Sequence, residues 1–224
     1  KFFFGTDQIG RDMLSMVIYG ARNMIALALL TTGCAFGLGS LLGFLAATMG
    51  GWVDQVLSRF VDVVISIPTL IFALIVLSST GTSIFALVTV IAIIYAMPVY
   101  RIARAVAMDI EVMDYVEAAR LRGEGLWWIM RKEILPNALT PLAAEFGLRF
   151  CFVFLLISGL SFLGLGLQPP LADWGAMVRD NGGGIAWGFM HPLVPATCIA
   201  LLTIGINLIV DSVVQKASGL REDH

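Results

Sequence analysis

The chain has 224 residues, of which 58% are apolar and 13% are charged, and its mean hydropathy is +0.90. Soluble domains usually carry about 25% charged residues, so the composition argues against a water-soluble globule and against a disordered chain. The net charge of −2 provides no basic surface for nucleic acid. The cysteines lie inside apolar stretches, too few and too scattered for a disulfide framework or a zinc site, and are expected to be packing residues. They are Cys34, Cys151 and Cys198.

Five segments are long and apolar enough to cross a membrane. A bilayer core of about 30 Å needs about 20 mostly apolar residues per helix, and a helix satisfies its own backbone hydrogen bonds in lipid. The predicted fold class is therefore all-α, a polytopic membrane helix bundle. The predicted spans are 24–49, 63–80, 84–100, 138–160 and 192–214.

Prolines and glycines mark two further features of these spans. Pro68 and Pro98 lie within or at the ends of spans and are expected to kink them. Glycines in the first span form two small-xxx-small patterns, which predict close contact with another helix. These glycines are Gly33, Gly37, Gly39 and Gly43.

Residues 1–23, before the first span, are expected to lie outside the cytoplasm. They hold a candidate helix N-cap, Thr6 or Asp7, and we expect a short amphipathic helix after it at the outer interface. The chain begins at Lys1 rather than at a methionine, and residues 1–22 lack the basic end and apolar run of a signal peptide. We therefore expect that a further segment precedes Lys1.

Lysine and arginine residues predict the orientation, because they are enriched in cytoplasmic loops. The 101–135 segment, the 50–61 loop and the C-terminal tail hold nine of them, against four on the other side. The first group is therefore predicted to be cytoplasmic, so that the first span starts outside and one more span is expected before Lys1. The nine are Arg59, Arg101, Arg104, Arg120, Arg122, Arg131, Lys132, Lys216 and Arg221, and the four are Lys1, Arg11, Arg22 and Arg179.

Residues 101–136 are predicted to form a helix–turn–helix that protrudes from the cytoplasmic side. The segment is longer than a connection between helices needs and holds six basic and six acidic residues. Gly123 is expected to be a left-handed helix C-cap, followed by a turn and by a second short helix, 126–134, that Pro136 ends. One helical face is predicted to combine Tyr115, Val116, Ala119 and the stem of Arg122, and Trp127 and Trp128 are expected near the interface.

The hairpin has two interpretations from its residues alone, an unpartnered surface hairpin or a docking element. An ordered protrusion with exposed apolar residues usually docks another molecule, which favours the second. The spacing EAA-x3-G-x10-ILP supports it further, because it resembles the "EAA" loop of ABC importer permeases. The residues that carry this resemblance are Glu117, Ala118, Ala119, Gly123, Ile134, Leu135 and Pro136.

The resemblance extends along most of the chain to the C-type permease of dipeptide, oligopeptide and nickel importers. The sequence departs from that pattern at Glu145 and Arg149, where the family usually has no charge, and at Ser212, where it more often has glycine beside the aspartate. These departures leave the substrate open. The similar segments are 4–22, 50–68, 159–178 and 207–219.

The resemblance implies a type I ABC importer transmembrane domain over 24–224, with a cytoplasmic coupling hairpin at about 101–136. Such a chain is half of a heterodimeric pore in the bacterial inner membrane, beside a second permease subunit. Two cytoplasmic ATPase subunits bind ATP and Mg, and an extracytoplasmic solute-binding protein delivers the cargo. The chain itself is expected to bind no cofactor or metal and to have no catalytic residue. It contains no Walker-type phosphate loop, so any ATP hydrolysis must occur on a partner.

The same resemblance implies roles for the hairpin residues. Glu117, Ala118, Ala119 and Gly123 would form the element that docks on the ATPase, with the alanines permitting close approach and Glu117 capping the helix or pairing with a base. Ile134, Leu135 and Pro136 would fix that element to the next membrane helix.

Glu145 and Arg149 are spaced i, i+4 inside a predicted span, with the acid first, which favours an ion pair. Charges within a span usually face an interior or a water-filled path. The pair is therefore either lining a pathway for a polar substrate or a buried structural pair. Asp62 and Asp211 fall near predicted cytoplasmic ends, where solvation explains them without a special role.

Two other function classes compete. An intramembrane protease would have to rely on Ser161 and His191, which lack the usual accompanying groups, and no HExxH ligand cluster is present. An ion-coupled secondary transporter or a channel subunit would explain the spans and Arg149, but not the long hairpin.

Overall fold

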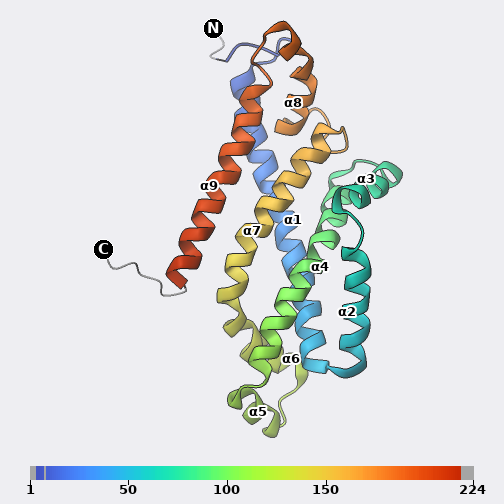
Figure 1. The fold of residues 1–224 in the computed structure, drawn as a ribbon, viewed down its shortest axis with the longest axis vertical. Helices are drawn as coiled ribbons and strands as arrows, with labels where there is room; N and C mark the ends of the chain where they lie inside the picture. The colour runs from blue at the N-terminus through green and yellow to red at the C-terminus, as the bar shows by residue number, and fades with distance from the viewer. Residues whose placement is uncertain (1–3, 8, 218–224) are drawn as a thin grey trace.

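The computed structural model describes residues 4–7 and 9–217, and it is a helical bundle elongated along one axis (Figure 1). A π-helical segment, Met130–Ile134, joins α6 to α7, and a 3-10 segment, Gly182–Trp187, follows α8. The described part of the chain contains no β-strand. The helices are α1 (Met13–Met49), α2 (Gly51–Ile65), α3 (Thr69–Thr80), α4 (Ile84–Glu111), α5 (Asp114–Leu121), α6 (Leu126–Ile129), α7 (Leu135–Phe162), α8 (Trp174–Asn181) and α9 (Leu193–Ala217).

Four helices are long and apolar enough to cross a membrane, or five when the bent pair of α2 and α3 counts as one span. The other four are α1, α4, the continuous helix Leu126–Phe162, and α9. The predicted all-α membrane bundle is thus confirmed. Of the residues used for the orientation and the resemblance, Lys1, Gln8, Ser218, Gly219 and Arg221 lie outside the described residues.

The predicted span over 63–80 is bent at Pro68, as expected, but its bounds differ from the prediction. The helix starts earlier, at Gly51, breaks after Ile65, and resumes at Thr69 with its axis turned by 86°. Pro68 explains the break, because proline has no amide hydrogen and disfavours helical geometry in the residue before it. As a result α3 lies crosswise to the long axis at the edge of the bundle, beside the first part of α4, while α2 runs along α4 (Figure 1).

The helix α1 begins at Met13, so the expected boundary between 23 and 24 falls inside one continuous helix. Its N-cap is Asp12, whose carboxylate accepts a hydrogen bond from the Ser15 amide at 3.1 Å. The predicted cap at Thr6 or Asp7, with a separate short helix after it, is therefore wrong. Asp7 instead pairs with Arg11 at 2.6 Å in the turn that precedes α1.

Two of the four glycines in α1 make the predicted close helix contact. A Cβ on Gly39 would lie 2.5 Å from the Ala96 carbonyl oxygen, and one on Gly43 would lie 2.8 Å from the Tyr100 carbonyl oxygen, both on α4. Gly33 and Gly37 have nothing within 4 Å of that position. The small-xxx-small signal is therefore confirmed for one pair of glycines, which sets the spacing between α1 and α4.

The second helix of the hairpin does not end at Pro136, contrary to the prediction. It continues through the π-helical segment into α7, and the Leu135 amide donates to the carbonyl of Met130, five residues back. Proline has no amide hydrogen to donate to the carbonyl four residues back. The wider π turn before it shifts the hydrogen bonds to a spacing of five residues, so the helix continues through Pro136. The second helix of the hairpin and the membrane helix α7 are consequently one continuous helix.

The loop between α7 and α9 is fixed on the bundle by Asp173, which is almost fully buried. Its carboxylate caps α8 through the Ala176 amide at 3.0 Å and accepts the Ser161 hydroxyl at 2.7 Å. The Trp174 ring nitrogen donates to the Val17 carbonyl on α1 at 2.9 Å. These hydrogen bonds hold the start of α8 against α7 and α1, at the end of the bundle opposite the hairpin.

Burial raises the pKa of the Asp173 carboxyl above its ordinary value, although hydrogen bonds from Ser161 and nearby amides act in the opposite direction. A raised pKa in the folded state means that this group stabilises the fold most at acidic pH and loses that contribution as the pH rises. We expect the stability of the wild-type protein relative to Asp173→Asn to fall as the pH rises from 4 to 8. Thermal unfolding midpoints of both proteins in detergent test this, and a flat or rising difference would contradict it.

Candidate functional site

The hairpin of α5 and α6 is anchored to the bundle through its inner face. Its buried side chains join a cluster with Phe44 and Ala47 of α1 and with Ala103 and Ala107 of α4. The hairpin therefore has a core shared with two membrane helices and is not a flexible loop on the surface. Its contributions to this core are Val116, Ala119, Ile129, Met130 and Ile134.

Gly123 ends α5 in a left-handed turn, as predicted. Its φ is +84°, its amide donates to the Arg120 carbonyl at 2.9 Å, and the Glu124 amide donates to the Ala119 carbonyl at 3.2 Å. These two bonds form the helix-ending motif in which a left-handed glycine satisfies the last carbonyls. The turn direction thus depends on glycine at this position.

Charged side chains connect the hairpin to α4 and connect its two helices to each other. Arg120 pairs with Glu111 at the end of α4, and the Arg122 guanidinium lies 5.8 Å from the centre of the Trp128 ring. The predicted shared face is only partly correct, because Tyr115 is 41% exposed whereas Val116 and Ala119 are fully buried. Tyr115 therefore points toward the outer surface of the hairpin.

The outer face of the hairpin is exposed and partly apolar. Glu117 and Ala118 are exposed, and Val112 and Leu121 are 81% and 83% exposed. Ala119 was predicted to permit close approach of a partner, but it packs inward against the bundle. Of the two alanines, only Ala118 lies where a partner could approach. This face, with Leu121 at its most exposed point, is the candidate docking surface.

The ILP residues occupy three different environments at the junction with α7. Ile134 is fully buried in the hairpin core, Leu135 is 39% exposed, and Pro136 is exposed. Ile134 therefore fixes the hairpin to the bundle, while Leu135 and Pro136 lie on the side of the membrane helix.

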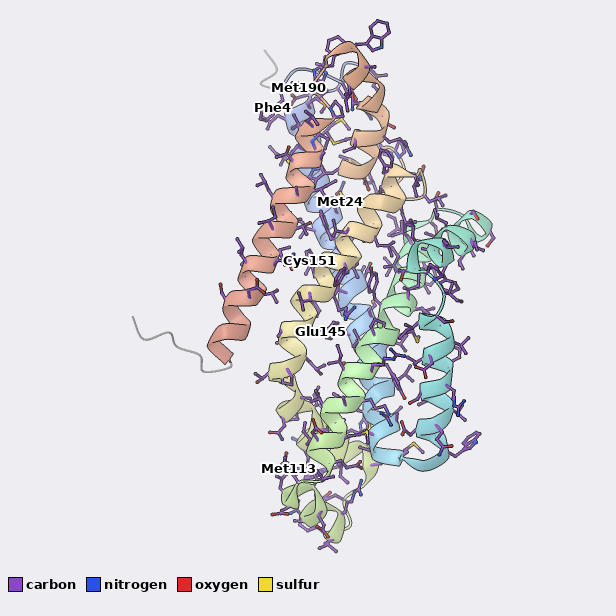
Figure 2. All side chains as sticks on the ribbon, in the orientation of Figure 1. Phe4, Met24, Met113, Glu145, Cys151 and Met190 are labelled. Atoms are coloured by element: carbon purple, nitrogen blue, oxygen red, sulfur yellow. The ribbon has the colours of Figure 1, made fainter. Side chains whose placement is uncertain are left out.

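Glu145 and Arg149 form the predicted ion pair on α7. Figure 2 places Glu145 along the middle stretch of that helix. Arg149 also lines a cavity of about 120 Å³ with Tyr95 and Pro98 of α4 and with residues on both sides of the α2–α3 break. The Tyr95 hydroxyl donates to the Phe152 carbonyl at 3.1 Å. The Arg149 guanidinium therefore lies where the break between α2 and α3 packs against α4.

A row of polar contacts between α2 and α4 was missed from the sequence. It includes two ion pairs and a hydroxyl pair at 2.9 Å, and Asp62 has a specific partner in it although its side chain is more than half exposed. The signal was the spacing of three polar residues by four along α2, which places them on one helix face. The pairs are Asp54–Arg104, Ser58–Tyr100 and Asp62–Arg101.

The remaining candidates have structural roles or none that the structure reveals. The Ser161 hydroxyl is buried and bonded to Asp173, which disfavours a nucleophile. Asp211 is exposed on α9. Gln168 donates to the carbonyls of Gly164 and Gly166 and shapes the outer loop. Among residues 4–7 and 9–217 no group of three metal-ligating side chains comes together.

Residues 39–217 match the family described as "Binding-protein-dependent transport system inner membrane component". The chain belongs to this family. It is a permease subunit of an ABC importer, a transport protein that works with ATPase and binding-protein partners. The alternative of an ion-coupled transporter or channel is not favoured.

The permease is 35% identical over 212 residues to the "Probable D,D-dipeptide transport system permease protein DdpC" of Escherichia coli (strain K12), covering 94% of this chain and 71% of that protein. It is 34% identical over 212 residues to the "Di/tripeptide transport system permease protein DppC" of Pseudomonas aeruginosa (strain UCBPP-PA14), covering 94% and 70%. A chain in the inward-facing structure of the MetNI methionine ABC transporter aligns with a TM-score of 0.72 at 18% identity, covering 92% of the permease and 97% of that chain. This likeness confirms the predicted importer transmembrane fold.

Proposed function

We propose that the permease forms half of the translocation pathway of an ATP-driven peptide importer. Peptides are the first choice of cargo because relatives from Escherichia coli and Pseudomonas aeruginosa are named as dipeptide and di/tripeptide permeases. Oligopeptides and nickel chelates are the other cargoes that the subfamily resemblance suggests. The second half of the pathway is a different permease subunit, and the complex lies in the bacterial cytoplasmic membrane.

The observation that carries this proposal is the anchored hairpin with an exposed outer face. Glu117, Ala118 and Leu121 face away from the bundle, while Val116 and Ala119 are buried in a core shared with α1 and α4. A displacement of the hairpin by a docked ATPase would therefore move the membrane helices with it, since packed cores transmit rather than absorb strain. The ATPase subunits would hold ATP and Mg, and the extracytoplasmic solute-binding protein would dock at the opposite end.

The proposed pathway runs along α4, between its contacts with α2 and its contacts with α7. Asp62 and Arg101 pair there although both side chains are more than half exposed. Charges at membrane depth are expensive against lipid and therefore face water or protein. The cavity beside Arg149 continues this path upward to the break between α2 and α3. This arrangement supports a pathway lined by polar and charged groups, which suits a zwitterionic cargo.

Uptake into proteoliposomes that contain the whole complex tests the proposal. We expect dipeptide uptake to require ATP on the ATPase side and the solute-binding protein on the other, and to be insensitive to proton or sodium gradients. Uptake that follows an ion gradient without ATP would overturn it.

We expect Arg149→Met to reduce dipeptide uptake by about tenfold, because losing a charge at membrane depth typically costs more than about 1 kcal/mol of interaction with a charged ligand. The double variant Glu145→Gln/Arg149→Met separates the two interpretations of the pair. A purely structural pair predicts that the double variant recovers uptake, since no unpaired charge is left. A pathway role predicts that uptake stays low while the complex still assembles.

A further inference from the structure

An apolar groove of about 530 Å³ opens on the side of the bundle between α1 and α7, at the hairpin end. Its volume lies within the range of about 300–1,000 Å³ typical of ligand sites. Phe36 of α1 and Phe146 of α7 meet at its inner end, with ring centres 5.0 Å apart. The groove therefore runs along the two helices, and the paired rings mark its end away from the hairpin.

The length of the groove along the helices matches the thickness of the hydrocarbon in one membrane leaflet. Its α7 wall extends from Leu135 to Phe146, and at about 1.5 Å per residue this corresponds to roughly 16 Å. Half of a hydrocarbon core of about 30 Å is nearly the same length. A single acyl chain would therefore run from the interface at the hairpin to the two phenylalanines.

The mouth of the groove carries one positive charge, Arg131, the only charged residue among the described residues that line it. Within the part of the chain that the structure describes, no carboxylate lies within 4.0 Å of Arg131, whereas Arg120 and Arg122 of the same hairpin approach Glu111 and Glu124. Trp127, one helical turn earlier, is 63% exposed at the same mouth. Tryptophan beside a basic residue is typical of a membrane interface.

We propose that this groove binds an anionic phospholipid, with the headgroup phosphate on Arg131 and an acyl chain between α1 and α7. Basic residues at the cytoplasmic ends of membrane helices attract anionic headgroups, and the charge selects this ligand over a zwitterionic lipid. The neighbouring apolar groove between α1, α7 and α9, about 370 Å³, has no charged residue among those that line it, so the same argument predicts no anionic headgroup there. The bound lipid would touch Trp127 and Met130, so it would brace the junction between the hairpin and the membrane helix.

Lipid retention by the full-length permease in its complex tests the proposal without relying on transport. The complex is purified, stripped with detergent, incubated with phosphatidylglycerol or phosphatidylcholine, and analysed by native mass spectrometry. We expect preferential retention of phosphatidylglycerol, reduced about fivefold in Arg131→Gln, since one basic residue near the surface contributes about that much to anionic-lipid binding. Lys132→Gln, which removes the adjacent exposed charge outside the groove, is expected to change retention less than twofold.

A second variant tests the acyl-chain position. Gly37 lines the groove with nothing within 4 Å of its Cβ position, so Gly37→Leu fills the groove without a clash. We expect it to release phosphatidylglycerol, while Gly33→Leu, which also adds its side chain to open space on α1 but outside the groove, retains it. Equal retention of both lipids by the wild type would overturn the proposal. So would a photo-crosslink from Ser40 to another protein segment in place of lipid.

Discussion

Replacing Gly43 with valine is expected to prevent the accumulation of folded protein. A Cβ at this position would lie 2.8 Å from both the Arg104 amide nitrogen and the Tyr100 carbonyl oxygen of α4. Backbone atoms cannot rotate away as side chains do, so α1 and α4 would have to separate along their contact. Overpacking of this kind costs about 3 kcal/mol, a large part of the total stability of a domain. Yield of monodisperse protein and its thermal midpoint in mild detergent measure the effect.

Gly33→Val is the matched control, because Gly33 lies on the same helix and a Cβ there meets nothing within 4 Å. The two substitutions add the same side chain to the same helix. They differ only in whether another helix lies against the substituted position. Gly33→Val is expected to stay within about 0.5 kcal/mol of the wild type, as surface substitutions usually do. Equal yields and midpoints for the two variants would show that the close contact between α1 and α4 does not determine stability.

Leu121→Asp is expected to remove the ATPase subunits from the complex and to leave the permease folded. Leu121 is 83% exposed at the end of α5, so its replacement leaves no cavity behind. An aspartate there would place a charge in the centre of the proposed docking surface, where truncation or desolvation of a central side chain typically costs 2 kcal/mol or more. We expect ATPase binding to weaken by more than tenfold, as measured by quantitative co-purification, and transport to fall accordingly.

Ile9→Asp provides the control at the other end of the bundle. Ile9 is 74% exposed, so the same change of side chain is made on an equally open surface far from the hairpin. ATPase co-purification is expected to match the wild type. If Leu121→Asp retained the ATPase subunits as well as Ile9→Asp does, the outer face of α5 would not be the docking surface.

The features that the sequence predicts correctly are those set by strong local chemistry. Long apolar runs must become helices in a bilayer, which is why the bundle and most spans could be anticipated. Gly123 could be assigned because few other residues adopt a φ of +84° without strain. The i, i+4 spacing of Glu145 and Arg149 was sufficient to predict their pairing on one helix.

The features that the sequence does not predict depend on neighbours in space. Pro68 breaks its helix by 86°, as predicted, whereas Pro136 is passed by a π turn, contrary to the prediction, and the sequence does not distinguish the two prolines. Gly39 and Gly43 face α4 while Gly33 and Gly37 face open space, which a repeat of small residues cannot distinguish. The pairing of Asp62 could not be predicted because its partner, Arg101, is 39 residues away along the chain.

The inward position of Ala119 illustrates the limit of a motif. The tripeptide of Glu117, Ala118 and Ala119 reads as one element, yet a helix turns 100° per residue and presents the three side chains in different directions. Ala119 is buried against the bundle, while the first two residues face outward. The motif therefore combines a docking function and a packing function, which are separable by mutation.

The subunit composition of the complex distinguishes an ABC importer from an ion-coupled transporter or a channel. The full-length permease is purified from its own cells in mild detergent, and its bound subunits are identified and counted by mass spectrometry. We predict a second, different permease subunit and two ATPase subunits per complex, with the ATPases lost in Leu121→Asp while the second permease stays bound. A stable homo-oligomer without ATPase subunits would contradict the importer account and would favour an ion-coupled transporter or a channel.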